Sequence, residues 1–405
     1  MRLPYKLSLL ATSFLLATSV QAEGFSAKQI GKGFTSISQD FLSSVSNPAL
    51  LNRYDNDDDF AISIGVGGAM SDEYDVIDIG EDLNDQINEL DDDIDQIGNI
   101  PLDQLPDYLA GLEFQVDDIV ENLEEIDGRP VAARVGFTAF VIIPNNSLNL
   151  GMFIDAYGRL GMMVDYDEDD EQTLRNSIVS GNLDLNDLKS NATGLGYIIT
   201  DAGFMFGGEL YQQDDLVINY GAKLKYQRID LFFNQVSVAE FDEDEFDLTD
   251  DEFLQDHSTA NADFGIHALW GDQQQWNFGL VANNIVEHEV DLTAQNRTFK
   301  LKPTLSTGFS YHNDWLNVAI EADLIEHESF EELSAVQYVS TGVEFNAFEH
   351  AQLRFGYRTD INNNEEDVYT AGIGLSPWDT VFLDIGVFKG EDDLVGAAIQ
   401  IGFKI

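Results

Sequence analysis

The chain of 405 residues contains no cysteine and only 8 prolines. Without cysteine no disulfide can stabilise the fold, which disfavours the small disulfide-stapled classes of exported protein. Glycine, in contrast, occurs 33 times, and several glycines fall inside strand-like runs. β-Barrels use glycine at such positions for bends and for close packing.

Basic residues are scarce as well. Lys and Arg number 20 against 74 Asp and Glu, so the net charge is −54. Such a charge argues against nucleic acid and anionic lipid headgroups as direct partners, because both repel an acidic surface. Cations are the natural counterpart. The excess of acid is also typical of a marine or halophilic secreted protein with solvated acidic loops, and the composition leaves both interpretations open.

The sequence has no uninterrupted apolar stretch of about 18 residues after its N-terminal region, so helical membrane insertion is excluded. An apolar run from Leu7 to Val20 follows Arg2 and Lys6 and precedes Gln21-Ala22. This is the pattern of a secretory signal peptide, and it predicts one over residues 1–22. An exported chain of this length without cysteine is typical of a bacterial envelope protein.

Sequence signatures of catalysis are missing. The 6 histidines are scattered, and no two have the i, i+4 spacing of a helical metal site. No glycine-rich phosphate loop precedes a helix, and no Gly-x-Ser-x-Gly elbow occurs. We therefore expect no enzyme, no catalytic residues and no bound cofactor.

Two C-terminal segments have the alternating pattern of β-strands. Apolar residues occupy every second position from Gly396 to Ile405, and the same alternation runs from Thr380 to Phe388. A strand of about ten residues with one apolar and one polar face suits a tilted strand that crosses a bilayer. The alternative is an edge strand of a soluble β-sandwich, which also alternates.

The same period of two returns along most of the chain, with short and long gaps in turn. We count fourteen strands, an even number that places the short turns on the periplasmic side and the long acidic loops outside. The predicted class is all-β, a transmembrane antiparallel barrel over residues 60–405. The strands begin near residues 60, 131, 148, 194, 216, 258, 276, 301, 315, 335, 351, 368, 380 and 394.

One region after the first strand has a different period. Apolar residues between Val76 and Ile97, and again between Val116 and Ile126, recur every three or four positions with acidic residues between them. This spacing predicts two amphipathic helices. We expect an acidic helical hairpin over residues 73–127 in the first outer loop, with Pro101 and Pro106 ending its first helix.

Strand alternation also predicts which charged residues face the barrel lumen. Two explanations suit this set: lumenal ion pairs with Glu321, Asp323 and Glu344, which we favour, or a site for an anionic ligand. The predicted lumenal residues are Arg134, Lys223, Lys225, Arg354, Arg358 and Glu321.

Alternating carboxylates at Asp55, Asp57 and Asp59 form a weak candidate for a divalent cation site. They lack the glycine and the distal glutamate of an EF-hand loop. Any calcium or magnesium here would be loosely bound.

Together, these features resemble the TraF-like conjugal-transfer outer-membrane family, which is similar in turn to FadL-type barrels. The resemblance rests on the motif Asn47-Pro48-Ala49 within Ser46–Leu51, on Asp59-Phe60 before the first strand, and on the signal peptide, acidic insert and barrel. In FadL-type transporters the segment before the first strand plugs a fourteen-stranded barrel, and hydrophobic ligands leave sideways. The resemblance thus implies a plug over residues 23–59, with Asn47, Pro48 and Ala49 as its motif.

The expected function is passage of small hydrophobic molecules across the bacterial outer membrane. The alternative is a surface-exposed interaction protein, associated with conjugal transfer, that acts through its acidic loops. A general porin is disfavoured if the plug is real. Expected partners are outer-membrane lipid, a small hydrophobic ligand and the barrel-assembly machinery, since the alternating C-terminal end resembles its recognition signal, although Ile405 replaces the usual aromatic residue.

Overall fold

The computed structural model describes residues 26–37, 41–54, 59–145, 148–240, 254–292, 297–330, 335–347, 350–377, 380–391 and 393–405. Three expectations lie outside these ranges: the signal peptide, and the side chains of Asp55 and Asp57.

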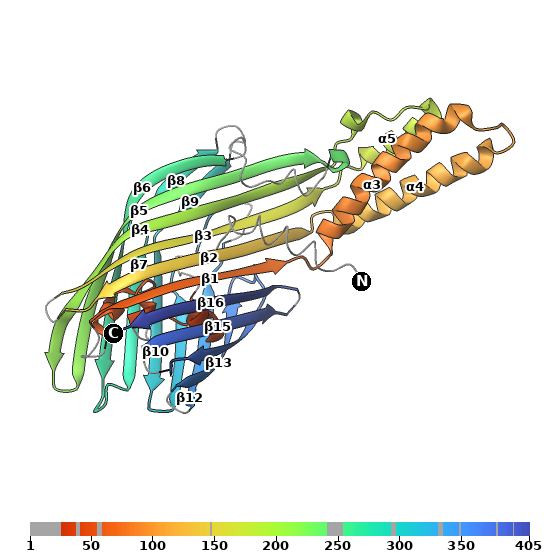
Figure 1. Ribbon diagram of the computed structural model, residues 1–405. Coiled ribbons are helices and arrows are strands. Elements are labelled where there is room, and N and C mark those ends of the chain that lie inside the picture. Colours follow the sequence, from red (N-terminus) through yellow and green to blue (C-terminus); the bar gives the residue numbers. More distant parts are fainter. Residues whose placement is uncertain are drawn as a thin grey trace.

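Fourteen antiparallel strands close into one barrel (Figure 1). The seam is the pairing of β1 with β16, with Ala61 opposite Lys404. The predicted all-β class, the number of barrel strands and the pairing of the last strand with the first are confirmed. The barrel strands are β1 (Ala61–Ser71), β2 (Pro130–Ile143), β3 (Asn149–Asp165), β4 (Asn191–Gln213), β5 (Leu216–Ser237), β6 (Leu254–Trp270), β7 (Trp276–Asn283), β10 (Thr304–His312), β11 (Leu316–Asp323), β12 (Tyr338–Ala347), β13 (Ala351–Asp360), β14 (Val368–Leu375), β15 (Val381–Gly390) and β16 (Val395–Lys404).

The barrel wall is much taller on one side than on the other (Figure 1). Strands β3 to β6, here named the tall wall, have 17, 23, 22 and 17 residues. Strands β10 to β16, the short wall, have only 8 to 10 residues each. A tilted strand crosses a bilayer with about 9–11 residues. The tall wall therefore extends beyond the membrane, whereas the short wall only spans it.

Alternation along each strand separates an apolar outer face from a polar inner one. On β5, Leu224 and Tyr226 are more than half exposed, whereas Lys225 and Gln227 are buried. On β16, Ile399 and Ile401 are exposed and Gln400 is buried. An apolar belt outside and polar side chains within are typical of a membrane-spanning barrel.

A helical domain is attached to the long-loop end of the tall wall (Figure 1). It consists of α3 (Val76–Gln96), η3 (Ile97–Asn99) and α4 (Leu105–Ile126), together with α5 (Asp169–Ser180) and η4 (Leu185–Asp187) from the β3–β4 loop. Pro106 lies in the first turn of α4 and therefore begins the second helix. Our prediction that it ends the first helix was wrong. Among the described residues, no helix is long and apolar enough to cross a membrane.

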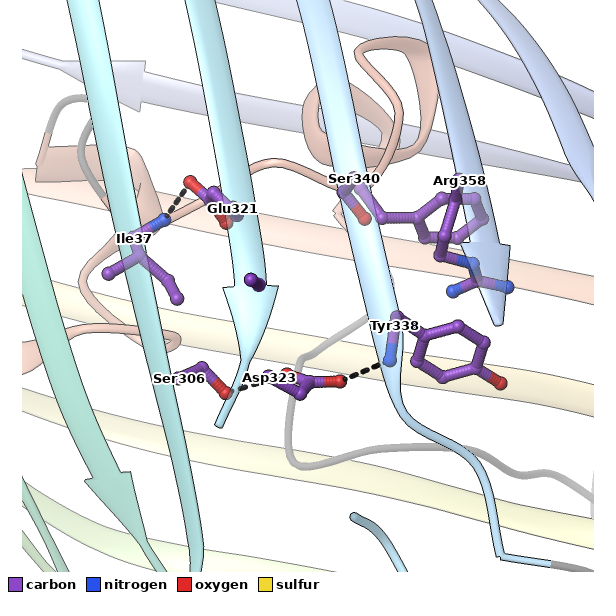
Figure 2. A pocket seen from close by; sticks show the side chains of 9 residues that line it. Ile37, Ser306, Glu321, Asp323, Tyr338, Ser340 and Arg358 are labelled. Atoms are coloured by element: carbon purple, nitrogen blue, oxygen red, sulfur yellow. Dashed lines mark hydrogen bonds between the residues drawn. The ribbon is translucent and has the colours of Figure 1, made fainter. Parts of the chain in front are cut away.

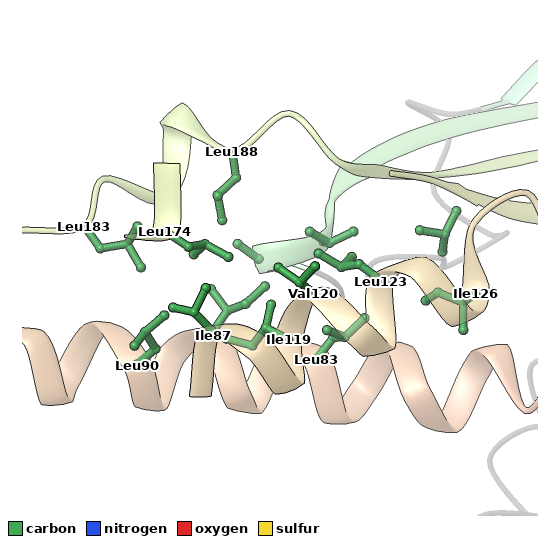
Figure 3. Close-up of a cluster of buried hydrophobic side chains, with 14 of the residues drawn as sticks. Leu83, Ile87, Leu90, Ile119, Val120, Leu123, Ile126, Leu174, Leu183 and Leu188 are labelled. Carbon is green, nitrogen blue, oxygen red and sulfur yellow. The ribbon is translucent and has the colours of Figure 1, made fainter. Parts of the chain in front are cut away.

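The helices share one hydrophobic core (Figure 3). Leu83, Ile87 and Leu90 of α3 face Ile119 and Leu123 of α4 within it. The sequence pattern did not indicate α5, because only Leu174 and Ile178 mark its buried face.

A second small sheet lies in the long connection between β7 and β10. Its strands are β8 (His288–Leu292) and β9 (Arg297–Leu301), which pair only with each other. Phe299 and Val290 of this hairpin pack against Tyr157 and Leu231 on the tall wall. The sequence pattern predicted a plain loop here, because each strand is only 5 residues long.

Candidate functional site in the barrel lumen

Residues 26–37 and 41–54, here named the lumenal segment, lie inside the barrel. The short helix α2 (Ala27–Gly31) contacts β14, β15 and β16, and η2 (Pro48–Asn52) contacts β4, β5 and β6. A third short helix, η1 (Phe41–Ser43), packs beside η2. The segment therefore touches both walls and fills the space between them.

Glycines in the tall wall make room for the Asn47-Pro48-Ala49 motif. A Cβ atom added at Gly221 would lie 2.1 Å from the carbonyl carbon of Pro48, and one at Gly265 would lie 2.0 Å from Oδ1 of Asn47. Only glycine permits so close an approach of strand and segment. These contacts give a physical reason for the strand glycines noted in the sequence.

Asn47 fixes the conformation of the motif itself. Its Oδ1 accepts a hydrogen bond from the amide of Ala49 at 3.1 Å, which caps η2. Its Nδ2 donates to the carbonyl of Ile37 at 2.9 Å and so joins two parts of the lumenal segment. On the wall, Lys223 Nζ donates to the carbonyl of Val45 at 2.8 Å.

The short wall holds the segment through Glu321 and Arg358 (Figure 2). The Glu321 carboxylate accepts the amides of Ser36 and Ile37 at 2.8 and 2.7 Å. The Arg358 guanidinium lies 3.7 Å from the ring centre of Phe34 and 4.3 Å from that of Tyr338. Both are cation–π contacts inside a buried site.

Most other predicted lumenal charges form buried ion pairs, in line with the explanation we favoured. Lys225 lies 2.9 Å from Asp201 and 3.0 Å from Asp263, and Lys223 lies 3.2 Å from Asp263. On the short wall, Arg354 pairs with Glu344 at 2.6 Å and with Asp384. Of the acidic partners we had named, Glu344 pairs with Arg354, one of these predicted cations. Asp323 pairs with His327 at 3.1 Å, and Glu321 binds backbone amides instead.

Arg134 belongs to a different arrangement, centred on Glu365. This glutamate lies in the loop 361–367 between β13 and β14, and its side chain is only 5% exposed. Its Oε1 pairs with Arg134 and, at 3.2 Å, with Arg159, while its Oε2 accepts the hydroxyl of Tyr338. Burial alone would raise the pKa of Glu365, but Arg134, Arg159 and Arg358 more than offset it and lower the pKa to about 2.

A cavity beside this cluster lies between the tall wall and the β8–β9 hairpin. It has about 550 Å³ of empty space, part of which is continuous with solvent. Six of its thirteen lining residues are aromatic or aliphatic, and the other seven are polar or charged. The residues that line it include Tyr157, Arg159, Tyr197, Ile199, Phe299, Leu301 and Lys302.

Sequence reasoning missed Asp263, Arg159 and Glu365. Asp263 and Arg159 could have been found from strand register, since they lie directly opposite Lys223 and Arg134 on the neighbouring strands. Glu365 has no such signal, because it lies in a loop and its partners come from distant strands.

The metal hypothesis stays a prediction. Across the described residues, no group of three His, Asp or Glu side chains is placed to hold a metal ion. Of the three candidates, only Asp59 is described, and its backbone amide donates to the carbonyl of Ile405 at the barrel seam.

The family described as "F plasmid transfer operon, TraF, protein" matches residues 44–323, more than half of the chain. The chain belongs to this TraF family. No curated protein matches this TraF-family barrel. The structural comparison, in contrast, finds the same fold in solved channels.

A "TodX deltaS2S3 mutant monoaromatic hydrocarbon channel" is 10% identical with a TM-score of 0.53, over 94% of this chain and 98% of that one. The Pseudomonas putida toluene transporter TodX is 10% identical with a TM-score of 0.50, over 96% and 98%. A Pseudomonas aeruginosa FadL homologue is 10% identical with a TM-score of 0.49, over 96% and 99%. The two TodX structures confirm the expected fold, and a barrel with this apolar belt is located in the bacterial outer membrane.

Proposed function

We propose that this TraF-family barrel passes small hydrophobic molecules across the outer membrane. The observation that carries the proposal is the aromatic cavity between the tall wall and the β8–β9 hairpin, with Tyr157, Tyr197 and Phe299 in its lining. Concave sites that combine apolar walls with convergent polar groups are typical of small-molecule binding.

The lumenal segment supports transport by way of a binding site in preference to free diffusion. It lies against both walls and is held by Glu321 on one side and by Gly221, Gly265 and Lys223 on the other. A lumen filled in this way leaves little room for a general aqueous pore. The fold is also that of structures described as a toluene transporter and a monoaromatic hydrocarbon channel.

The long loops and the helical domain would then face the outside, and the short turns the periplasm, as in other outer-membrane barrels. The cavity near the long-loop end would meet a substrate before the lumenal segment does. Release would require the segment to shift or the wall to part.

Uptake of labelled toluene tests the proposal, in a strain that lacks the gene and in the same strain complemented with it. We expect faster uptake in the complemented strain and a loss of that gain with Phe299→Ala, which removes a cavity wall. Phe114→Ala is the matched control, because Phe114 is 68% exposed on α4. Equal uptake with and without the barrel, for toluene and for longer hydrocarbons, would contradict the proposal.

A further inference from the structure

Three arginines converge on one carboxylate at the centre of this acidic protein. The chain has 20 basic residues against 74 acidic ones. Yet Arg134 and Arg159 form ion pairs with Glu365, and the charge of Arg358 also stabilises its carboxylate. Arg134 and Arg159 are also direct cross-strand partners on β2 and β3. Like charges opposite one another in a sheet destabilise it, so an anion between them is needed.

Glu365 supplies this anion from across the barrel. Tyr338 on β12 and Arg159 on β3 contact the same carboxylate, although β12 and β3 lie seven positions apart in the ring of fourteen strands. They therefore belong to opposite walls. The side chain of Glu365 thus joins the two walls at this level.

The cluster retains unused binding capacity. The Nε groups of Arg134, Arg159 and Arg358 are buried without a hydrogen-bond partner within the described part of the chain, and so is the hydroxyl of Tyr157. The residues Arg134 and Arg358 are only 6% and 5% exposed. Buried donors of this kind are costly unless something accepts from them. One carboxylate does not satisfy three guanidinium groups, each of which can bind a carboxylate through two N–H groups.

The cluster also adjoins the aromatic cavity, because Arg159 pairs with Glu365 and lines the cavity as well. We propose that Arg134, Arg159 and Arg358 form a carboxylate-binding site that Glu365 occupies in this structure, and that an incoming organic acid displaces Glu365 while its apolar part lies in the cavity. The inference rests on the proposed function and narrows its substrate class to small amphipathic acids. Glu365 is then an internal competitor that occupies the site until such an acid arrives.

Binding to the purified full-length barrel tests this, with benzoate as the acid and toluene as the neutral probe. An internal competitor lowers apparent affinity by the fraction of time that it occupies the site. We therefore expect E365Q to bind benzoate at least about tenfold more tightly than the wild type. R159Q should bind benzoate at least about tenfold more weakly, since one charge-assisted contact is lost. Toluene binding should change in neither variant.

E289Q is the matched control, because it removes the same charge from an exposed position on β8. It should leave benzoate affinity unchanged. Benzoate affinity that is the same in wild type and E365Q, or the same in wild type and R159Q, would overturn the proposal.

A measurement on the wild type covers the case in which a variant does not fold. Glutamyl endopeptidase should cleave after Glu365 faster with benzoate present and at an unchanged rate with toluene, because only an acid releases the carboxylate. Cleavage that benzoate leaves unchanged would overturn the proposal.

The two proposals fail in different ways. Toluene uptake without benzoate binding would overturn the carboxylate site and leave hydrophobic transport standing. Benzoate binding in a barrel that takes up neither compound would overturn hydrophobic transport and leave the carboxylate site standing.

Discussion

The two sides of the barrel wall differ in length and in what they bury. The short wall of β10 to β16 buries polar side chains such as Glu344, Arg354 and Asp384. Apolar residues such as Phe355 and Ile373 face outward, although Val368 and Phe388 pack against the lumenal segment. The tall wall has the same pattern where it meets the lumenal segment. Beyond that level it turns apolar inside, with Ile199, Ile229 and Leu231 in a hydrophobic cluster under β8 and β9. The length and polarity of the short wall therefore fit a strand that only crosses the membrane. The upper part of the tall wall instead packs on a hydrophobic core outside the membrane.

The apolar face of an alternating strand can therefore point in either of two directions within one barrel, outward to lipid or inward to a core. At membrane depth the apolar face contacts lipid and the polar face is buried. Above the membrane the apolar face turns toward a core of its own, as in a soluble protein. The helical domain has a core of its own, which Val164, Ala192 and Val238 join from the ends of β3, β4 and β5.

The largest expected effect is at the seam that joins the two sides. Removing Phe403 to Ile405 takes away the residues that pair with Ile62 and Ala61 of β1 and with Phe60, which precedes it. We expect no closed barrel in the outer membrane, because the edges of β1 and β15 would be left with unpaired backbone groups in lipid. Heat-modifiable mobility of the truncated protein in outer-membrane fractions measures this. A folded, heat-modifiable band would contradict it.

A smaller effect is expected from the buried charges of the tall wall. Asp263→Asn takes the shared partner from Lys223 and Lys225, and breaking a buried pair costs about 3–5 kcal/mol. Urea unfolding in detergent should show this loss. Asp256→Asn, on the same strand but exposed, is the control and should change stability by less than about 0.5 kcal/mol. Equal effects of the two variants would mean that the lumenal pairs do not stabilise the barrel.

Acid should act on the contact between the walls at Glu365. Its pKa is lowered from 4.5 to about 2, so the ionised carboxylate stabilises the fold fully above about pH 4.5. That contribution, about 3 kcal/mol, is lost as the pH falls toward 2. The stability difference between wild type and E365Q should therefore be constant near neutral pH and shrink below pH 4.5. A difference that does not change down to pH 2 would show that the carboxylate has an ordinary pKa.

The smallest effect is expected in the helical domain. Ile87→Val removes one buried methylene from the core in Figure 3, which costs about 1 kcal/mol. The helices should melt at a lower temperature by circular dichroism, while the barrel keeps its heat-modifiable mobility and its toluene uptake. Loss of barrel stability in this variant would mean that the two regions fold as one unit.

The barrel was predictable because its strands obey one simple period. Alternation placed Lys223, Lys225 and Arg354 in the interior, and burial of all three agrees with it. The helices α3 and α4 were predictable for a similar reason, since long apolar stripes at three- and four-residue spacing mark their buried faces.

What could not be predicted depends on contacts between distant parts of the chain. The hairpin of β8 and β9 is stabilised by packing on the tall wall, and its short strands carry little signal of their own. Glu365 has its partners on β2, β3 and β12, and nothing in its local sequence indicates them. A site that bridges a barrel forms only when the closed ring brings distant strands together. The alternation along a single strand does not indicate which strands these are.

The seam between β1 and β16 also determines the order of two folding steps, placement of the lumenal segment and closure of the barrel. The lumenal segment precedes β1, and the ring that encloses it is complete only when β16 has paired with β1. Gly221 and Gly265 approach the segment so closely that it could hardly be threaded into a finished ring past them. The lumenal segment, which is synthesised before the barrel strands, must therefore be in place before β16 pairs with β1.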